Sequence, residues 1–323
     1  MDWDEIDTKF EEFKSFPVEQ RSLIDKELKI DALEIENLLE SNSLTRSEIS
    51  VLLKSGLSIG GKDFIDHLET VNHSDAYDWV QSQAHRSLED IDLRDILYIH
   101  LLISKGIEIQ AGRIRMEDLQ PTTSPKLPTP DKILQLLQNL IAWIQISKDL
   151  HPIDLAIEAH YRLLLISPFQ NRNGRVARMF MNMILIINEY PISLIIEKNF
   201  DQYSENIVNV QNDANLNSVN KRTIGSAIEY SLDMRLNVLR NLNVPVQETN
   251  FGGFLKIGEL AKSVGEANST IRYWMKKELL KPAKVLPSGY QLFNQESLAR
   301  AHYIQDLKSQ RYTLSEIKGL IIN

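Results

Sequence analysis

A polar stretch, SPFQNRNGRVAR from Ser167 to Arg178, joins two apolar segments and determines how this sequence is interpreted. The segment before it covers residues 154–166, and the segment after it, residues 176–189, is apolar on nearly every face. Length and pattern predict that both are helices and that the second lies at the centre of a core. A polar loop between two buried helices is a position where a functional site is expected.

Within this stretch, Asn173-Gly174-Arg175 opens the second helix. The free N–H groups and the positive end of a helix favour an anion such as phosphate. Arg175 and Arg178, three residues apart on one face, add positive charge. The alternative is that these arginines form surface salt bridges with carboxylates of the body, because short Gly/Arg motifs recur by chance. The residues alone leave both interpretations open.

The surrounding sequence predicts a predominantly all-α fold, with helix after helix from residue 1 to about 240. Thr129-Pro130-Asp131 is typical of a helix start, because proline is favoured at the first helical position. Residues 111–130 are too polar and proline-rich for a helix, so we expect a loop with a short β-hairpin. Residues 241–253 have no period and contain Pro and a Gly pair, which predicts a linker.

Composition narrows the class of protein. The 323 residues include no cysteine, which excludes disulfides and fits a cytoplasmic protein. The amino terminus is acidic, unlike an export signal, and no apolar run is long enough to span a membrane. The net charge is −8, but residues 251–323 hold 11 Lys and Arg against 6 Asp and Glu. A module of net charge +5 therefore follows a body of net charge −13.

The loop resembles the signature of the Fic family of AMP transferases, written HPFx[D/E]GNGRxxR. Six positions match and three depart: Ser167 stands where the family has His, Asn171 where it has an acid, and Arg172 where it has Gly. The resemblance covers roughly residues 30–235, because further stretches resemble conserved parts of the family, namely Ser58–Lys62, His67–Glu69, Val71–His73, Ala111–Arg115 and Ala159–Arg162.

The resemblance implies an ATP-dependent transfer of AMP to a target hydroxyl. It places Ser167 at the general-base position and Asn171 at the magnesium-ligand position. It also implies a nucleotide- or phosphate-binding set of residues: Arg172, Asn173, Gly174, Arg175 and Arg178. A serine hydroxyl is a poor base, and loss of general-base catalysis costs about 10²–10⁴-fold. An amide brings no charge to magnesium, so metal binding is expected to weaken. Arg172 brings a Cβ to a position where glycine permits close approach of a phosphate, but it also adds a cation.

Two further expectations follow from this resemblance. Many relatives carry an inhibitory helix whose Glu pairs with the last Arg of the signature, and Glu40 lines up with that Glu, so we expect a contact between Glu40 and Arg178. Glu36 and Ser41 depart from the inhibitory motif, and the alternative is that Glu40 is a solvated helix residue. His160 is expected to be a core histidine rather than a relocated base. No pair of histidines has the spacing of a metal site.

Residues 256–321 read as helix, turn, helix, wing and two more helices, with Ser269-Thr270 as the expected cap of the second helix. The pattern resembles a MerR-type winged helix-turn-helix, which implies binding to duplex DNA. The second helix of such a module enters the major groove. The expected DNA-binding residues are Thr270, Arg272, Tyr273, Lys276, Lys277 and Lys284. The alternative is a module for protein contacts. The chain lacks the long dimerisation helix of MerR regulators, so a homo-oligomer is expected to form through the body.

The sequence thus predicts four regions: an N-terminal helical region at 1–110, a Fic-like core at 111–240, the linker 241–253 and a winged-helix domain at 254–323. Three functions fit it. The first is a DNA-binding regulator with an impaired or inactive transferase site that still binds ATP or another nucleotide. The second is an active adenylyltransferase whose tail serves for targeting and whose flap, 111–130, docks a protein target. The third is a scaffold of the toxin–antitoxin kind.

Overall fold

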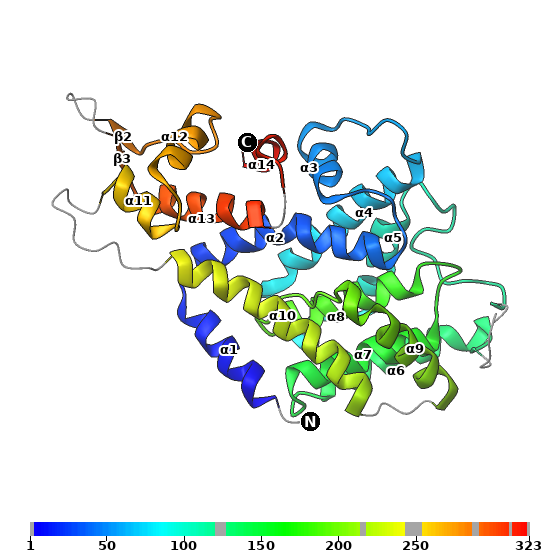
Figure 1. The fold of residues 1–323 in the computed structure, drawn as a ribbon. Helices are drawn as coiled ribbons and strands as arrows, with labels where there is room; N and C mark the ends of the chain where they lie inside the picture. The colour runs from blue at the N-terminus through cyan, green and yellow to red at the C-terminus, as the bar shows by residue number, and fades with distance from the viewer. Residues whose placement is uncertain are drawn as a thin grey trace.

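The computed structural model describes residues 3–119, 127–213, 218–242, 254–285, 291–309 and 312–321, and it is mostly helical (Figure 1). The described chain forms a helical body, residues 3–242, and a smaller C-terminal module, residues 254–321. The α-helices of the body are α1 (Asp4–Ser15), α2 (Val18–Leu39), α3 (Arg46–Ser55), α4 (Phe64–Gln81), α5 (Leu93–Ser104), α6 (Pro130–Ile146), α7 (Pro152–Ile166), α8 (Asn173–Ile187), α9 (Phe200–Asp213) and α10 (Ser218–Leu242). Three 3-10 helices join them, η1 (Ser82–His85), η2 (Leu88–Asp90) and η3 (Glu197–Asn199).

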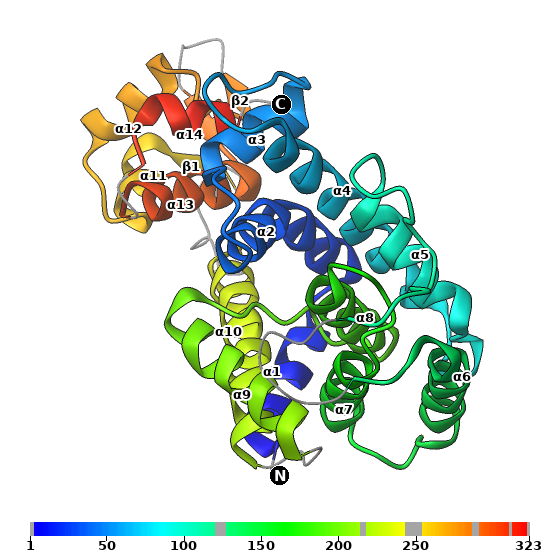
Figure 2. The ribbon, with the colours of Figure 1, turned by 90° about the vertical axis from the view of Figure 1, so that its right-hand side faces the viewer.

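Helix α8 is the central element of the body, as the sequence predicts. Its residues from Arg175 to Ile186 are all buried. Helix α7 packs along it, and α4 and α5 cover other faces (Figures 1 and 2). Helix α7 begins at Pro152, two residues earlier than the sequence pattern indicates. Helix α8 begins at Asn173, as the Asn-Gly-Arg stretch predicts, and ends at Ile187, two residues earlier than the pattern indicates. The polar loop 167–172, which we call the central loop, is thereby held between two buried helices.

The two ends of the body lie side by side. Helix α1 packs against α10 (Figure 1), and the indole of Trp3 donates a hydrogen bond to Asp154 at 3.1 Å. One hydrophobic core runs from Trp3 to Leu239. This core crosses residue 110, where the sequence places a boundary between two regions, and that boundary stays a prediction.

The C-terminal module has its own core around Trp274, which is fully buried. Its elements are β1 (Leu255–Lys256), α11 (Ile257–Ser263), α12 (Asn268–Lys276), β2 (Lys284–Val285), β3 (Gln291–Phe293), α13 (Gln295–Ser309) and α14 (Leu314–Ile321). The strands pair antiparallel in the order β1-β3-β2, with Leu255 opposite Phe293 and Lys284 opposite Leu292.

The expected cap of the second helix is wrong. Helix α12 begins at Asn268 with Ala267 before it, so Ser269 and Thr270 lie inside the first turn rather than ahead of it. A capping box opens α14: the backbone N–H of Thr313 donates to Glu316 at 2.7 Å, and the Thr313 hydroxyl accepts from the Glu316 N–H at 3.3 Å.

The expected hairpin in the flap is not seen in the part of the flap that the structure describes. Residues 111–119 and 127–129 form turns and extended chain without a strand, and residues 120–126 lie outside the described residues. All strands of the described chain belong to the C-terminal module, where short segments find partners in a sheet. The linker 241–253 also lies outside the described residues, except that its first two positions end α10.

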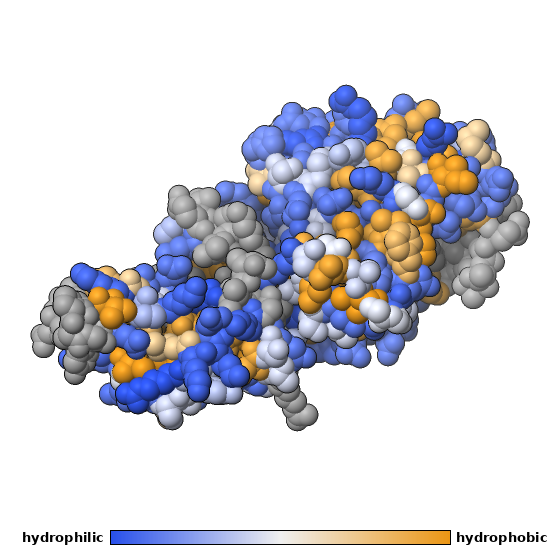
Figure 3. Space-filling view, turned by 90° about the horizontal axis from the view of Figure 1, so that it is seen from above, coloured by the Kyte–Doolittle hydropathy of each residue, from blue (hydrophilic) through white to orange (hydrophobic). Residues whose placement is uncertain are grey.

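Seen from above, the molecule is elongated, with the module at one end and the body at the other (Figure 3). Helix α14 of the module contacts α3, and α13 contacts α10 (Figures 1 and 2). Among the described residues, no helix has the length and apolar character needed to cross a membrane.

Candidate functional site

The central loop is bounded by two residues in the left-handed region. Ser167 closes α7 with φ of 43°, and Arg172 precedes α8 with φ of 62°. This conformation costs a residue with a Cβ roughly 1–2 kcal/mol. The surrounding contacts must therefore fix the loop, and such residues cluster at functional sites.

One set of contacts comes from within the loop. The side chain of Asn173 accepts a hydrogen bond from the Phe169 N–H at 2.9 Å and donates one to the Phe169 carbonyl at 2.8 Å. The ring of Phe169 is fully buried and stacks on His100 with 3.8 Å between ring centroids. The Asn173 amide thus braces the loop, while its backbone N–H lies at the amino end of α8.

A second set comes from the flap. Arg115, which is 1% exposed, donates from Nε to the Ser167 carbonyl at 2.9 Å. Its backbone N–H donates to the Pro168 carbonyl at 2.9 Å. The other guanidinium nitrogens donate to the carbonyls of Glu117 at 2.8 Å and Pro128 at 2.5 Å. One buried arginine therefore joins both ends of the flap to the central loop.

The arginines of the signature are bound by four carboxylates, which we call the carboxylate cluster: Glu36, Glu40, Glu69 and Glu108. Arg178 donates from Nε to Glu36 Oε2 at 2.9 Å and from Nη2 to Glu40. Arg175 donates to Glu69 at 2.9 Å and lies 3.4 Å from Glu40. Arg172 donates to Glu69 at 2.8 Å and to Glu108. The expected contact between Glu40 and Arg178 is present, and Glu40 is not a solvated helix residue.

These pairs are buried, unlike the surface salt bridges that the sequence offered as an alternative. Arg175 and Arg178 are 6% and 4% exposed. Burial raises the pKa of the Glu40 carboxyl, but the charges of Arg178 and Arg175 outweigh burial and hold this pKa below its ordinary value. The pKa of Glu69 is lowered in the same way, against burial, by Arg175 and Arg172. The carboxyl groups of Glu40 and Glu69 therefore stay ionised at neutral pH.

Two buried histidines, His73 and His160, lie close to the cluster. Burial lowers the pKa of His73 to about 4 and that of His160 to about 3. His160 lies in the core, 2.9 Å from the Tyr203 hydroxyl, as expected for a core histidine. The hydroxyl of Ser167 donates to the Leu164 carbonyl at 2.7 Å, which completes the end of α7. Asn171 is exposed on the loop.

Sequence reasoning missed three of the four carboxylates. Glu36 appeared only as a departure from the inhibitory motif, and Glu69 only as part of a resembling stretch. Glu108 carried no signal, because only the fold brings it next to Arg172. Among the described residues, no group of three or more His, Cys, Asp or Glu is arranged to hold a metal ion.

Of the residues expected to face DNA, all but Lys284 lie on α12 or at its end, and Lys284 begins β2. Arg272, Tyr273, Lys276, Lys277 and Lys284 are exposed, and Thr270 is half-buried. Lys277 lies over the Tyr273 ring at 5.6 Å from its centroid. Helix α12 lies on the side of the module away from the body (Figure 1). The helix thus presents cations on an accessible face.

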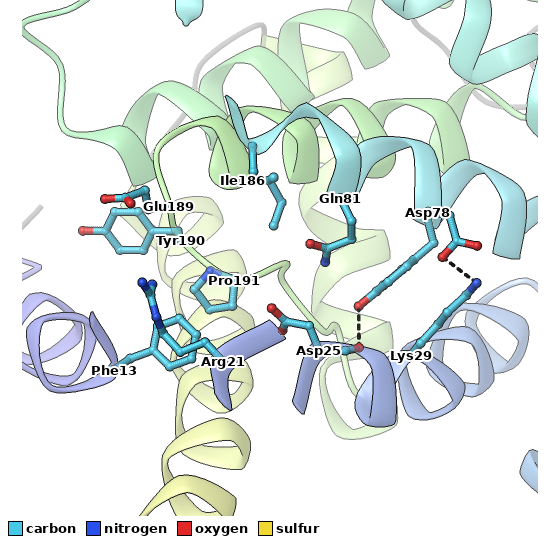
Figure 4. A pocket seen from close by; sticks show the side chains of 12 residues that line it. Phe13, Arg21, Asp25, Lys29, Asp78, Gln81, Ile186, Glu189, Tyr190 and Pro191 are labelled. Atoms are coloured by element: carbon cyan, nitrogen blue, oxygen red, sulfur yellow. Dashed lines mark hydrogen bonds and ion pairs between the residues drawn. The ribbon is translucent and has the colours of Figure 1, made fainter. Parts of the chain in front are cut away.

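A separate cavity of about 490 Å³ lies at the other end of α8 (Figure 4). Arg21, Asp25 and Gln81 line it from α2 and α4, and Tyr190 lines it from the segment after α8. Lys29 and Asp78 at its edge pair with each other at 2.7 Å. The signature arginines take no part in this cavity, which is distinct from the central loop.

Comparisons with known proteins agree with this architecture. A model of the Fic/DOC family matches residues 90–185, and a model of MerR HTH family regulatory proteins matches residues 255–322. Protein adenylyltransferase Fic of Nematostella vectensis is 30% identical over 200 residues, which cover 59% of this chain and 46% of that protein. Protein adenylyltransferase Fic of Drosophila grimshawi is 28% identical over 224 residues, which cover 67% of this chain and 46% of that protein. The chain spans less than half the length of these two relatives.

Solved structures show the same fold. Fic-1 (residues 134–508) from Caenorhabditis elegans superposes with a TM-score of 0.65 at 23% identity, over 74% of this chain and 72% of that one. A Fic domain containing signaling protein from Bacteroides thetaiotaomicron gives a TM-score of 0.61 at 19% identity, over 82% and 98% of the two chains. The chain thus holds a domain of the Fic/DOC family, and it is similar to protein adenylyltransferases. In particular, it combines a Fic/DOC family domain at residues 90–185 with a C-terminal MerR HTH domain at residues 255–322.

Proposed function

We propose that this protein is a DNA-binding regulator whose Fic-type site is closed by its own carboxylates and transfers AMP weakly or not at all. The observation that carries the proposal is the pairing of Arg172, Arg175 and Arg178 with the carboxylate cluster. A nucleotide phosphate would need these guanidinium groups, which are already bound. Opening the cluster requires breaking buried ion pairs, and leaving such a charge unpaired is costly unless the ligand replaces the partner.

The residues at the reacting positions support a weak catalyst. The Ser167 hydroxyl donates its proton to the Leu164 carbonyl, and no imidazole stands at that position. His160 and His73 are buried, and His160 lies 2.9 Å from the Tyr203 hydroxyl within the core. General-base catalysis is worth about 10²–10⁴-fold, so its loss leaves at most a slow transfer.

Magnesium fits this site poorly. Asn171 offers a neutral amide oxygen where the family has an acid, and the nearby carboxylates of the cluster are engaged by arginines. Magnesium prefers charged oxygen ligands together with the phosphates of the substrate. The activity that we propose for the site is therefore nucleotide binding.

The C-terminal module supports the second half of the proposal, since a MerR HTH domain implies DNA binding. The exposed cations on and after α12 are suited to phosphate contacts, and Arg272 and Tyr273 on the same helix are suited to base edges. The similarity to protein adenylyltransferases favours a second function, an active AMP transferase that uses the module for targeting.

Labelled ATP separates these two functions. The wild-type protein, the opened variant Glu40→Gly, the restored variant with Ser167→His, Asn171→Asp and Arg172→Gly, and the combined variant are incubated with ATP, magnesium and a cell lysate. We expect transfer to proteins to be near background for the wild type and strongest for the combined variant. Brisk transfer by the wild type would overturn the regulator and support the active enzyme.

DNA binding is tested on the same preparations with pools of random duplexes. We expect selection of a preferred sequence and an affinity that falls steeply with salt. Absence of any binding at low salt would contradict the regulatory function and favour the scaffold.

A further inference from the structure

Arg46, the first residue of α3, contacts both parts of the molecule. Its guanidinium binds the Asp31 carboxylate of α2 through Nε and, at 3.1 Å, through Nη2. Its backbone N–H donates to Glu34 of the same helix at 3.0 Å. These two contacts fasten α3 to α2 just ahead of Glu36 and Glu40, the residues that pair with Arg178.

The same guanidinium reaches the C-terminal module. Nη2 donates to the Tyr303 hydroxyl of α13 at 3.2 Å, and the guanidinium carbon lies 5.3 Å from the centroid of the Tyr312 ring, just before α14. The module also contacts α3 through α14 and α10 through α13. Arg46 is only 3% exposed, and it lies in the contact between the module and α3.

One hydrogen-bond donor in the contact between the module and α3 lacks a partner. Nη1 of Arg46 is buried and has no hydrogen-bond partner among the described residues. A buried donor without a hydrogen-bond partner costs free energy. The free energy that favours the docked arrangement is therefore smaller than it would be with Nη1 paired. The body also carries a net charge of −13, beside a module with a net charge of +5. The negative charge of the body therefore repels a DNA duplex that approaches the docked module.

We propose that Arg46 couples the two parts of the protein. Docking of the module on α3 holds α2 in the position that pairs Glu36 and Glu40 with Arg178, and release of the module loosens that pairing. Arg46 acts as a positioning residue through α2 and does not itself contact the signature arginines. The inference rests on the proposed closure of the site by the carboxylate cluster.

Thermodynamic linkage makes the coupling reciprocal. DNA binding that releases the module increases the affinity for nucleotide, and nucleotide binding increases the affinity for DNA by the same factor. A substitution that releases the module is therefore expected to increase nucleotide binding, and one that opens the carboxylate cluster is expected to increase DNA binding. Coupling between sites in proteins typically lies near 5–150-fold, so an effect of about fivefold is expected in each direction.

The test uses full-length protein and a fluorescent ATP analogue whose dissociation constant is measured at equilibrium without added magnesium. Tyr303→Phe together with Tyr312→Leu changes only the module and is expected to tighten analogue binding about fivefold. Tyr98→Phe, at an exposed tyrosine of α5, is the control and should leave the constant unchanged. If the double variant does not fold, as judged by circular dichroism, Tyr303→Phe alone replaces it and is expected to act in the same direction.

The reciprocal arm measures the affinity of Glu40→Gly for a duplex selected by the wild type. We expect the affinity for the duplex to rise. Two failures are distinguishable. If Glu40→Gly does not tighten analogue binding, the closure of the site is wrong. If Glu40→Gly does so while the tyrosine variants stay within twofold of wild type, only the coupling through Arg46 is overturned.

Discussion

Glu36 and Arg178 are 142 residues apart in the chain and form a buried ion pair, with Nε of the arginine 2.9 Å from Oε2 of the glutamate. Glu40, one helical turn after Glu36, binds the same guanidinium. The last arginine of the signature therefore has two carboxylate partners at the end of α2. Burial lowers the pKa of Arg178, but the charges of Glu36 and Glu40 help to hold this pKa well above its ordinary value.

Removal of either carboxylate is expected to free part of the guanidinium for a nucleotide phosphate. Glu36→Gln and Glu40→Gln should each tighten binding of an ATP analogue about three- to tenfold, since one charged hydrogen bond is worth about 1.5–3 kcal/mol and part of that is offset by the remaining partner. Because both residues share Arg178, the double variant should deviate from additivity in a double-mutant cycle. Glu117→Gln, an exposed carboxylate of the flap, is the control. Additive effects would contradict a shared partner.

Arg115 is expected to stabilise the central loop. Arg115→Met removes three side-chain hydrogen bonds to carbonyls and should lower the free energy of unfolding by roughly 2–4 kcal/mol, because these acceptors are left buried or poorly solvated. Urea denaturation measures the change. Arg113→Met, two positions earlier and exposed, is the matched control and should change the free energy by about 0.5 kcal/mol or less. Equal effects of the two variants would show that the flap is not fastened through Arg115.

Acid is expected to destabilise the body through its buried histidines. The folded-state pKa of His160 is lowered by burial to about 3, below the ordinary value of 6.5. A histidine with a lowered pKa contributes stability that is present above pH 6.5 and is lost as the pH falls toward the folded pKa. The free energy of unfolding should fall between pH 6.5 and 4, with His160 contributing up to about 1.4 kcal/mol per pH unit. His160→Gln should reduce this slope, and an unchanged slope would mean that His160 is protonated in the folded protein.

DNA binding is expected to depend on salt through single lysines of the module. Lys277→Gln should reduce the slope of the logarithm of the affinity against the logarithm of salt concentration by about 0.9, the contribution of one phosphate contact. Lys308→Gln is the control, because Lys308 pairs with Glu266 at 3.0 Å on a different helix of the module. If only Lys308→Gln reduced the dependence of DNA affinity on salt, another face of the module would bind DNA.

Much of the fold could be predicted from the sequence, because the long apolar periods and the Thr129-Pro130 start are local signals. The loop between α7 and α8 was predictable as the site for the same reason. The partners of its arginines were only half predictable. Glu40 was found through a resembling motif, whereas Glu36, Glu69 and Glu108 approach the loop from segments whose position depends on tertiary packing. The cap of α12 was misplaced because Ser and Thr favour caps but are also tolerated in a first turn.

The module helps to bury Arg46, and this burial has a consequence for experiments on truncated forms of the chain. Truncation of the chain after α10 would do more than remove the DNA-binding module. It would leave a guanidinium facing water instead of two tyrosines, next to the helix that bears Glu36 and Glu40. Nucleotide affinities measured on the shortened protein would then describe a molecule with a different resting state, and they should be compared only with values from the intact chain.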